Sequence, residues 1–274
     1  MKEDLEKIII RLRMCYGHNI SVYEESFLQK TINKRLSATR ITTMAEYLEF
    51  LENDKIEENC LINSLNINYS EFFRNPLSFS CLEQVVLPIL AGRKKKNHEK
   101  EIRVWSAACA SGQEAYSIAI LFEEIIECQQ EIIPFRIFAS DISPTHINEA
   151  IIGNYPESSL NNVTHKRIGK YFTKSNGTFN INTGLKKYID FSEFDLLSED
   201  CICPPASVFG NFDIIFCNNL LFYYKQQSRL KIINKIRTSL APDGFLLTGE
   251  SEREILLSCG FREFITNTAI FQRK

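Results

Sequence analysis

Polar side chains suited to binding a ligand follow three short apolar runs of this chain. IRVWSA at 102–107 leads into a stretch of small residues before Glu114, FRIFAS at 135–140 is followed by Asp141, and FDIIF precedes CNNLLFYY at 217–224. If the runs are parallel strands, their carboxyl ends lie along one edge of a sheet, where ligands of open α/β folds bind. We therefore expect these side chains to share one site.

Each of these strand ends also has a purely structural interpretation. The stretch after IRVWSA has one glycine, so it lacks the GxGxxG spacing of dinucleotide-binding loops and is also typical of a tight strand-to-helix turn. Asp141 can accept hydrogen bonds from both hydroxyls of a ribose, or it can cap a helix that Ser143 and Pro144 predict. The residues alone leave these alternatives open.

The sheet that would position these residues is predicted by an alternation of strands and helices after residue 101. Amphipathic helical patterns at 114–130, 144–152 and 227–241 separate short strand-like runs. The strand-like runs are IRVWSA, FRIFASDI, FDIIFCNN, DGFLLTGES, FREFIT and TAIFQRK. This pattern predicts an α/β domain with a parallel sheet. Asn176-Gly177 is a strong hairpin signal, so we expect a small antiparallel β insert at about residues 161–192.

The first 91 residues have apolar side chains at helical spacing and are predicted to form an all-helical module. Thr43 with Glu46 forms a capping box, which predicts a helix start there. The stretch GRKKKNHEKE at 92–101 has no apolar residue and is predicted to be a linker, with a nucleic-acid signal as the weaker alternative. The predicted domains are therefore 1–91, the linker 92–101 and the α/β domain 102–274.

Composition excludes several classes of protein. The 274 residues include 32 Lys and Arg against 34 Asp and Glu, so a net charge of −2 draws the chain neither to nucleic acid nor to anionic lipid. No apolar run approaches the roughly 18 residues of a membrane helix, and the acidic start differs from a signal peptide. Nine scattered cysteines without a CxxC pair and four histidines argue against structural zinc. We expect a reduced cytoplasmic protein without metal or membrane insertion, and by default a monomer.

Six segments of the chain together resemble one family. They are NYSEFFRN (68–75), RVWSAACASGQEAYSIAI (103–120), FASDISPTHINEAIIGNYP (138–156), FDLL (194–197), FDIIFCNNLLFYY (212–224) and LAPDGFLLTGESE (240–252). In order and spacing they resemble the CheR-type chemotaxis receptor methyltransferases, and the resemblance extends over nearly the whole chain. It implies a Rossmann-like S-adenosylmethionine-dependent methyltransferase domain with a small antiparallel β insert, preceded by an all-helical N-terminal domain.

The resemblance implies protein-glutamate O-methyltransferase activity. The substrates would be glutamate side chains on the cytoplasmic domains of methyl-accepting chemotaxis receptors, and S-adenosylhomocysteine would be the second product. By the resemblance, Arg74 and Tyr223 handle the substrate and the methyl group, while Lys30, Lys34, Arg35 and Arg40 on the second helix meet the acidic receptor helices. The residues implied to bind the cofactor are Asn68, Ser70, Arg74, Glu114, Asp141, Asp195, Leu196, Asn218 and Asn219.

Three positions depart from the family pattern. Asn218 stands where the family usually has Arg, Asp195 where it usually has Asn, and Gln113 where it often has Glu. The departures at Asn218 and Asp195 keep open the alternative of a catalytically silent regulator that binds the cofactor. A methyltransferase for a different protein carboxylate is the other alternative. A nucleic-acid amino-methyltransferase would place prolines after FDIIF, where this chain has none, and a nicotinamide-linked oxidoreductase would need the missing glycine fingerprint.

Overall fold

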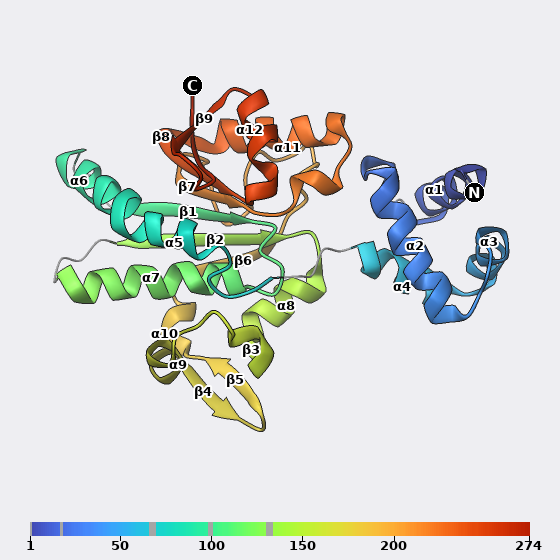
Figure 1. The fold of residues 1–274 in the computed structure, drawn as a ribbon, viewed down its shortest axis with the longest axis horizontal. Helices are drawn as coiled ribbons and strands as arrows, with labels where there is room; N and C mark the ends of the chain where they lie inside the picture. The colour runs from blue at the N-terminus through green and yellow to red at the C-terminus, as the bar shows by residue number, and fades with distance from the viewer. Residues whose placement is uncertain (1, 17–18, 66–69, 98–100, 130–133) are drawn as a thin grey trace. The chain divides into compact units, whose positions relative to one another are not determined.

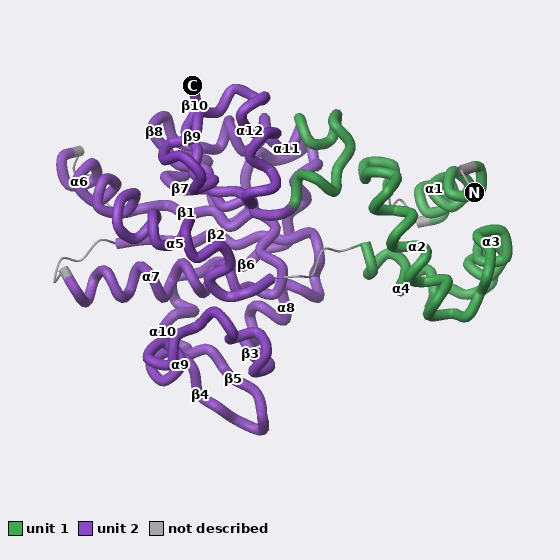
Figure 2. Tube along the Cα trace, viewed as in Figure 1, with its two compact units in different colours: residues 1–67, 220–230 green, residues 68–219, 231–274 purple. Residues whose placement is uncertain are grey.

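Helices built from the first 65 residues form the core of the first of two compact units in the computed structural model (Figure 1). Residues 2–16, 19–65, 70–97, 101–129 and 134–274 are described. Unit 1 comprises residues 1–67 and 220–230, and unit 2 comprises residues 68–219 and 231–274 (Figure 2).

The N-terminal part of unit 1 is all-helical, as predicted. Its helices bury one apolar face each around a core that includes Leu28, Tyr47 and Leu61. Thr43 caps the third helix, because its hydroxyl accepts a hydrogen bond from the backbone N–H of Glu46 at 3.2 Å. The helices are α1 (Lys2–Tyr16), α2 (Glu25–Thr39), α3 (Met44–Asn53) and α4 (Lys55–Leu65), with a 3-10 turn η1 (Ile20–Val22) before α2.

Unit 2 contains the predicted sheet. Among the described residues its seven strands run in the order β6-β2-β1-β7-β8-β10-β9, and the first five are parallel to one another. β1 lies between β2 and β7, so the carboxyl ends of all three strands are neighbours. The strands are β1 (Ile102–Ala107), β2 (Phe135–Asp141), β6 (Ile189–Glu193), β7 (Phe212–Cys217), β8 (Leu240–Thr248), β9 (Phe261–Ile265) and β10 (Ile270–Arg273).

The helices of unit 2 connect the strands of this sheet. α7 follows β1, α8 follows β2 and α11 leads into β8, which is the crossover pattern of parallel strands. These elements are α7 (Gln113–Gln129), α8 (Pro144–Ile152), α11 (Gln226–Ser239) and α12 (Arg253–Ser258), with the 3-10 turn η5 (Glu250–Glu252). The 3-10 turn η4 (Leu221–Tyr223) and α11 up to residue 230 belong to unit 1. None of the described helices is both long and apolar enough to cross a membrane.

The predicted antiparallel insert is a separate three-stranded sheet in the order β3-β5-β4. Asn176 and Gly177 both have positive φ, which is the backbone that a two-residue hairpin turn requires. The insert, whose two longer strands are yellow in Figure 1, consists of β3 (Asn154–Pro156), η3 (Glu157–Leu160), α9 (His165–Tyr171), β4 (Phe172–Ser175), β5 (Thr178–Ile181) and α10 (Thr183–Lys186).

The charged stretch predicted as a linker is helical over its first six residues, which differs from the prediction. Helix continues from α5 (Pro76–Cys81) through the π-helical turn η2 (Leu82–Val86) and α6 (Leu87–Asn97), and residues 98–100 lie outside the described residues. These helices belong to unit 2 rather than to the N-terminal module, because their apolar face packs into the core of the sheet.

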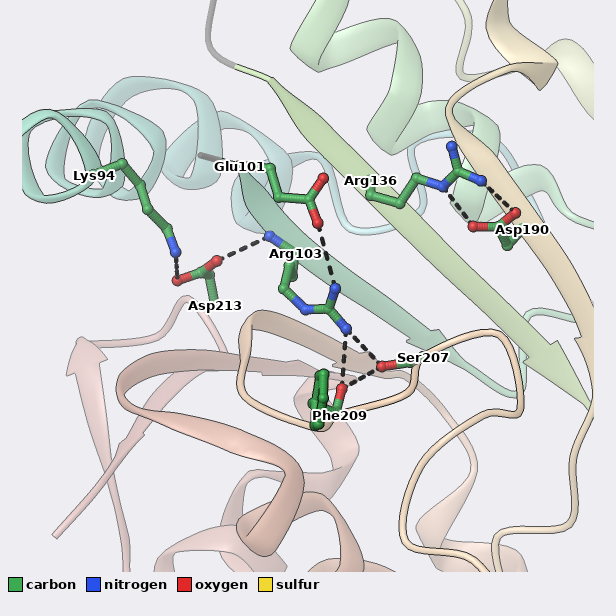
Figure 3. Close-up of polar contacts among 8 residues, drawn as sticks. All are labelled: Lys94, Glu101, Arg103, Arg136, Asp190, Ser207, Phe209 and Asp213. Atoms are coloured by element: carbon green, nitrogen blue, oxygen red, sulfur yellow. Dashed lines mark hydrogen bonds and ion pairs between the residues drawn. The ribbon is translucent and has the colours of Figure 1, made fainter. Parts of the chain in front are cut away.

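Two basic residues of this stretch are held by the sheet. Lys94 forms an ion pair with Asp213 at 2.8 Å, and the other oxygen of Asp213 accepts the backbone N–H of Arg103 at 2.9 Å (Figure 3). Arg93 donates to the carbonyl of Asp243 at 2.8 Å. Charge density predicted a solvated linker, whereas these partners stabilise a helix.

A second polar cluster lies where β1, β2 and β6 begin, as Figure 3 shows. The Arg103 guanidinium donates to the hydroxyl of Ser207 at 2.7 Å and to the carbonyl of Phe209 at 2.9 Å, which fastens the loop before β7. Arg136 on β2 forms a bidentate pair with Asp190 on β6. These contacts stabilise the amino ends of the strands, opposite the edge expected to bind ligand.

We predict that Lys94→Gln destabilises unit 2, because the buried Asp213 carboxylate then loses its ion pair with Lys94. The free energy of unfolding should fall by about 2–3 kcal/mol in urea titrations. Lys96→Gln, an exposed position on the same helix, is the matched control and should change it by less than about 0.5 kcal/mol. Equal stabilities of the two variants would contradict a role for the Lys94–Asp213 pair.

Candidate active site

The Asp141 carboxylate joins the ends of β1 and β2. Asp141 is the last residue of β2 and only 6% exposed, and its Oδ2 accepts the backbone N–H of Ala110 from the loop after β1 at 2.9 Å. Its Oδ1 accepts the N–H of Ser143 at 2.9 Å. Ser143, not Asp141, caps α8, because the Ser143 hydroxyl accepts the N–H of His146. The helix-cap interpretation of Asp141 was therefore wrong.

The loop after β1 reaches Asp141 through an unusual backbone. Ala108, Ala110 and Gly112 have φ values of 62°, 47° and 90°, in the left-handed region. A Cβ at Gly112 would lie 2.8 Å from the Cβ of Ala150 on α8, so close packing as well as conformation requires glycine there. Ala108 and Ser111 of this loop are half-buried, whereas Cys109, Ala110 and Gly112 are buried.

Glu114 forms the second acidic group of the edge. One of its carboxylate oxygens accepts the hydroxyl of Ser106 at 2.5 Å, and the other accepts the side-chain amide of Asn218 at 2.6 Å. Burial raises the pKa of Glu114, while these two hydrogen bonds and the nearby charge of Arg74 act in the opposite direction. The structure thus brings together three residues predicted from different segments of the chain, Arg74, Glu114 and Asn218.

Asn219 is fixed by a carboxylate that the sequence analysis missed. The backbone N–H of Asn219 donates to the fully buried Glu252 at 2.8 Å, and the same oxygen accepts the N–H of Gly249 at 2.9 Å. The side-chain Oδ1 of Asn219 is buried, and no hydrogen bond to it is found within the described residues. Glu252 follows the end of β8, so the strand-end rule applied to the GESE segment would have found it.

His146 is a further neighbour of Asp141 that the sequence did not single out. Its Nδ1 lies 3.3 Å from Oδ1 of Asp141, and both side chains are buried. The hydrogen bond to Asp141 raises the pKa of His146, against the opposing effect of burial. The only sequence signal was its place in the first turn of the helix after β2.

The remaining predicted cofactor residues of unit 2 are less closely connected. Asp195 lies after β6 with its carboxylate exposed, where Oδ1 accepts the N–H of Leu197 at 2.7 Å, and Leu196 is buried. Ser70 is half-buried, and Asn68 lies outside the described residues. No hydrogen bond found among the described residues joins Asp195, Leu196 or Ser70 to the cluster around Asp141.

Tyr223 and the proposed docking residues belong to unit 1. Lys30, Lys34 and Arg40 are exposed at α2 and its C-terminus. Arg35 differs, because its guanidinium forms a bidentate pair with the buried Glu57, at 2.8 and 2.5 Å. Arg35 therefore stabilises the helical unit itself, and it does not belong to the exposed basic face.

Comparisons with known proteins agree with this organisation. The family model described as "CheR methyltransferase, all-alpha domain" matches residues 3–65, and "CheR methyltransferase, SAM binding domain" matches residues 68–258. The chain belongs to the CheR methyltransferase family. The resemblance, the fold class and the cofactor S-adenosylmethionine are thereby confirmed, and the chain is an S-adenosylmethionine-dependent methyltransferase of chemotaxis.

Curated relatives match the CheR chain over most of its length. The chemotaxis protein methyltransferase of Borreliella burgdorferi is 32% identical over 92% of this chain and 88% of its own. That of Escherichia coli is 30% identical over 86% of this chain and 79% of its own, and that of Listeria monocytogenes is 29% identical over 92% of both chains.

The strand ends of this CheR chain fit S-adenosylmethionine chemically. The nucleoside has hydroxyl and amine donors, which need acceptors such as the Asp141 carboxylate and the buried Oδ1 of Asn219. The sulfonium is a cation, and Glu114 places a carboxylate at the same edge. The departure at Asn218 leaves this acid hydrogen-bonded, because the Asn218 amide donates to Glu114.

We predict a pH-dependent contribution of His146 to stability. Because the folded-state pKa of His146 is raised, its hydrogen bond to Asp141 stabilises the protein fully below the unfolded pKa of about 6.5 and is lost as pH rises through the folded value. The unfolding free energy lost in His146→Gln should therefore be larger at pH 6 than at pH 9.

Urea titrations of both proteins at the two pH values measure this difference. His165→Gln changes an exposed histidine at the start of α9 and is the matched control. A stability loss for His146→Gln that is equal at both pH values, or larger at pH 9, would contradict the His146–Asp141 interaction.

Proposed function

We propose that this CheR methyltransferase esterifies glutamate side chains on the cytoplasmic domains of chemotaxis receptors. The family match and the relatives named chemotaxis protein methyltransferase support a receptor as substrate. The observation that carries the choice of a carboxylate is Arg74, whose positive charge acts on Glu114 at the edge where Asp141 and Asn218 also lie. We further propose that the protein acts in the cytoplasm as a monomer.

The reaction demands positioning more than acid–base catalysis. S-adenosylmethionine, when bound, would supply an electrophilic methyl group for transfer to a carboxylate oxygen, and S-adenosylhomocysteine would leave as the neutral thioether. A glutamate with a reference pKa of about 4.3 is already ionised at pH 7, so the site needs no general base. The protein's task is to align two reactants.

The residues of unit 2 have separate roles in this proposal. The Asp141 carboxylate accepts two backbone N–H groups and the ring of His146, and it retains a lone pair on Oδ2 for a ribose hydroxyl. Asn219 offers its buried Oδ1 to a donor of the cofactor, and Glu114 with Asn218 faces its charged part. The remaining proposed contacts to the cofactor are those of Asn68, Ser70, Arg74, Asp195 and Leu196.

Substrate recognition is assigned to Arg74, Tyr223 and α2. The planar fork of Arg74 suits a carboxylate, and the Tyr223 hydroxyl donates a hydrogen bond near the transferred methyl. The exposed Lys30 and Lys34 lie one turn apart on α2, and Arg40 ends that helix. Such a face suits the acidic helices of a receptor.

We predict that Arg74→Lys lowers kcat about tenfold and Arg74→Ala about a hundredfold. Lysine keeps the charge but not the bidentate geometry, and alanine keeps neither. The measurement is transfer of labelled methyl from S-adenosylmethionine to purified cytoplasmic fragments of the same organism's receptors. Arg136→Lys alters the surface pair with Asp190 at the opposite end of the sheet and should leave kcat unchanged.

The stability of the methylated product in alkali shows whether a carboxylate accepted the methyl group. A glutamate methyl ester releases its label as methanol in mild alkali. Label that survives alkali, or near-normal kcat in Arg74→Ala, would contradict the proposed function. Alkali-labile label on another protein, with none on the receptor fragments, would favour the alternative of a different protein carboxylate.

A further inference from the structure

The backbone around Tyr223 is held from both sides within unit 1. Tyr223 ends the 3-10 turn η4, in the segment 220–230 that clusters with the N-terminal helices (Figure 2). On one side runs the extended stretch before α2, where the N–H of Glu24 donates to the carbonyl of Tyr223 at 2.9 Å and the carbonyl of Val22 accepts the N–H of Lys225 at 2.8 Å. These two bonds form an antiparallel bridge.

A single guanidinium holds the other side of this turn. The Nε of Arg229 donates to the carbonyl of Leu221 at 3.0 Å, and its Nη2 donates to the carbonyl of Tyr224 at 2.8 Å. The same Nη2 lies 3.1 Å from the carboxylate of Glu24. Arg229 therefore fixes both ends of η4 and ties them to the N-cap residue of α2, which only the planar fork of arginine can do.

The ring of Tyr223 is held by neighbouring aromatic rings. Phe27, in the first turn of α2, meets it edge-on with ring centroids 4.8 Å apart, and Phe222 lies 4.3 Å away. Two ring contacts restrict the side-chain rotamer and therefore the direction of the phenol hydroxyl. The backbone and ring of Tyr223 are thus both fixed by groups without an assigned function.

We propose that Arg229 and Phe27 are positioning residues for Tyr223. Arg229 fixes the peptide groups that carry Tyr223, and Phe27 fixes its ring, so that the hydroxyl is oriented before substrate binds. The inference rests on the proposed role of Tyr223. In this proposal α2 has two roles, because it carries the exposed lysines and also Phe27, whose ring contact orients Tyr223.

A double-mutant cycle between Arg229 and Tyr223 tests this inference. In the receptor-fragment assay, Arg229→Gln should lower kcat about tenfold through misplacement of the hydroxyl. The dissociation constant of S-adenosylhomocysteine, measured by calorimetry, should stay within about twofold. In the Tyr223→Phe background the same change should cost less than about twofold, because the hydroxyl that it positions is already absent.

Two variants complete the design. Glu24→Gln keeps its backbone bond to Tyr223 but removes the charge that pairs with Arg229, so it should lower kcat about threefold with the same non-additivity. It remains informative if Arg229→Gln fails to fold. Lys231→Gln is the matched control, since it removes an exposed cation of the same helix that pairs with Glu199, and it should leave kcat unchanged.

The outcomes separate this inference from the proposed function. Equal losses in both backgrounds, unchanged kcat in Arg229→Gln, or weaker binding of S-adenosylhomocysteine in parallel with the loss would overturn the positioning role alone. Full kcat in Tyr223→Phe would overturn the role of Tyr223 as well, while Arg74→Ala would still report independently on esterification.

Discussion

The hydrogen bond between the Asp141 carboxylate and the N–H of Ala110 is the constraint on which the site depends. Asp141 is buried, so its charge must be met by donors, and bonds to a charged group contribute about 1.5–3 kcal/mol each. That stabilisation holds Ala108 and Ala110 in left-handed conformations, which cost about 1–2 kcal/mol each for residues with a Cβ. The loop is therefore shaped before ligand arrives, and S-adenosylmethionine meets a preformed edge.

The fold was predictable where local pattern and tertiary environment agree. Every strand-like run of the α/β domain is a strand, and the Asn176-Gly177 hairpin lies in the expected antiparallel insert. The stretch 92–97 failed because charge density alone cannot show a partner, and Lys94 finds Asp213 more than a hundred residues away. A basic run is a solvated linker only when no distant acid binds it.

The candidate site was also predictable only in part. Strand ends and the family resemblance led to Asp141 and to Arg74, Glu114 and Asn218, and the structure connects the last three through a hydrogen bond or charge. The sequence did not reveal Glu252 and His146, which support these residues. Their roles depend on hydrogen bonds to the backbone of Asn219 and to the side chain of Asp141, which only the folded chain shows. Arg35 shows the converse error, since the basic run of this helix and the resemblance grouped it with Lys34, while the buried Glu57 binds its guanidinium.

A crystal structure of the protein with S-adenosylhomocysteine tests the central claim most directly. The claim is that the Asp141 carboxylate forms hydrogen bonds to two partners at once, the loop after β1 and the nucleoside. The expected result is a ribose with a hydroxyl within hydrogen-bond distance of the Asp141 carboxylate, with the Ala110 bond retained. A nucleoside bound elsewhere, with the Asp141 carboxylate contacting only Ala110, Ser143 and His146, would contradict the account.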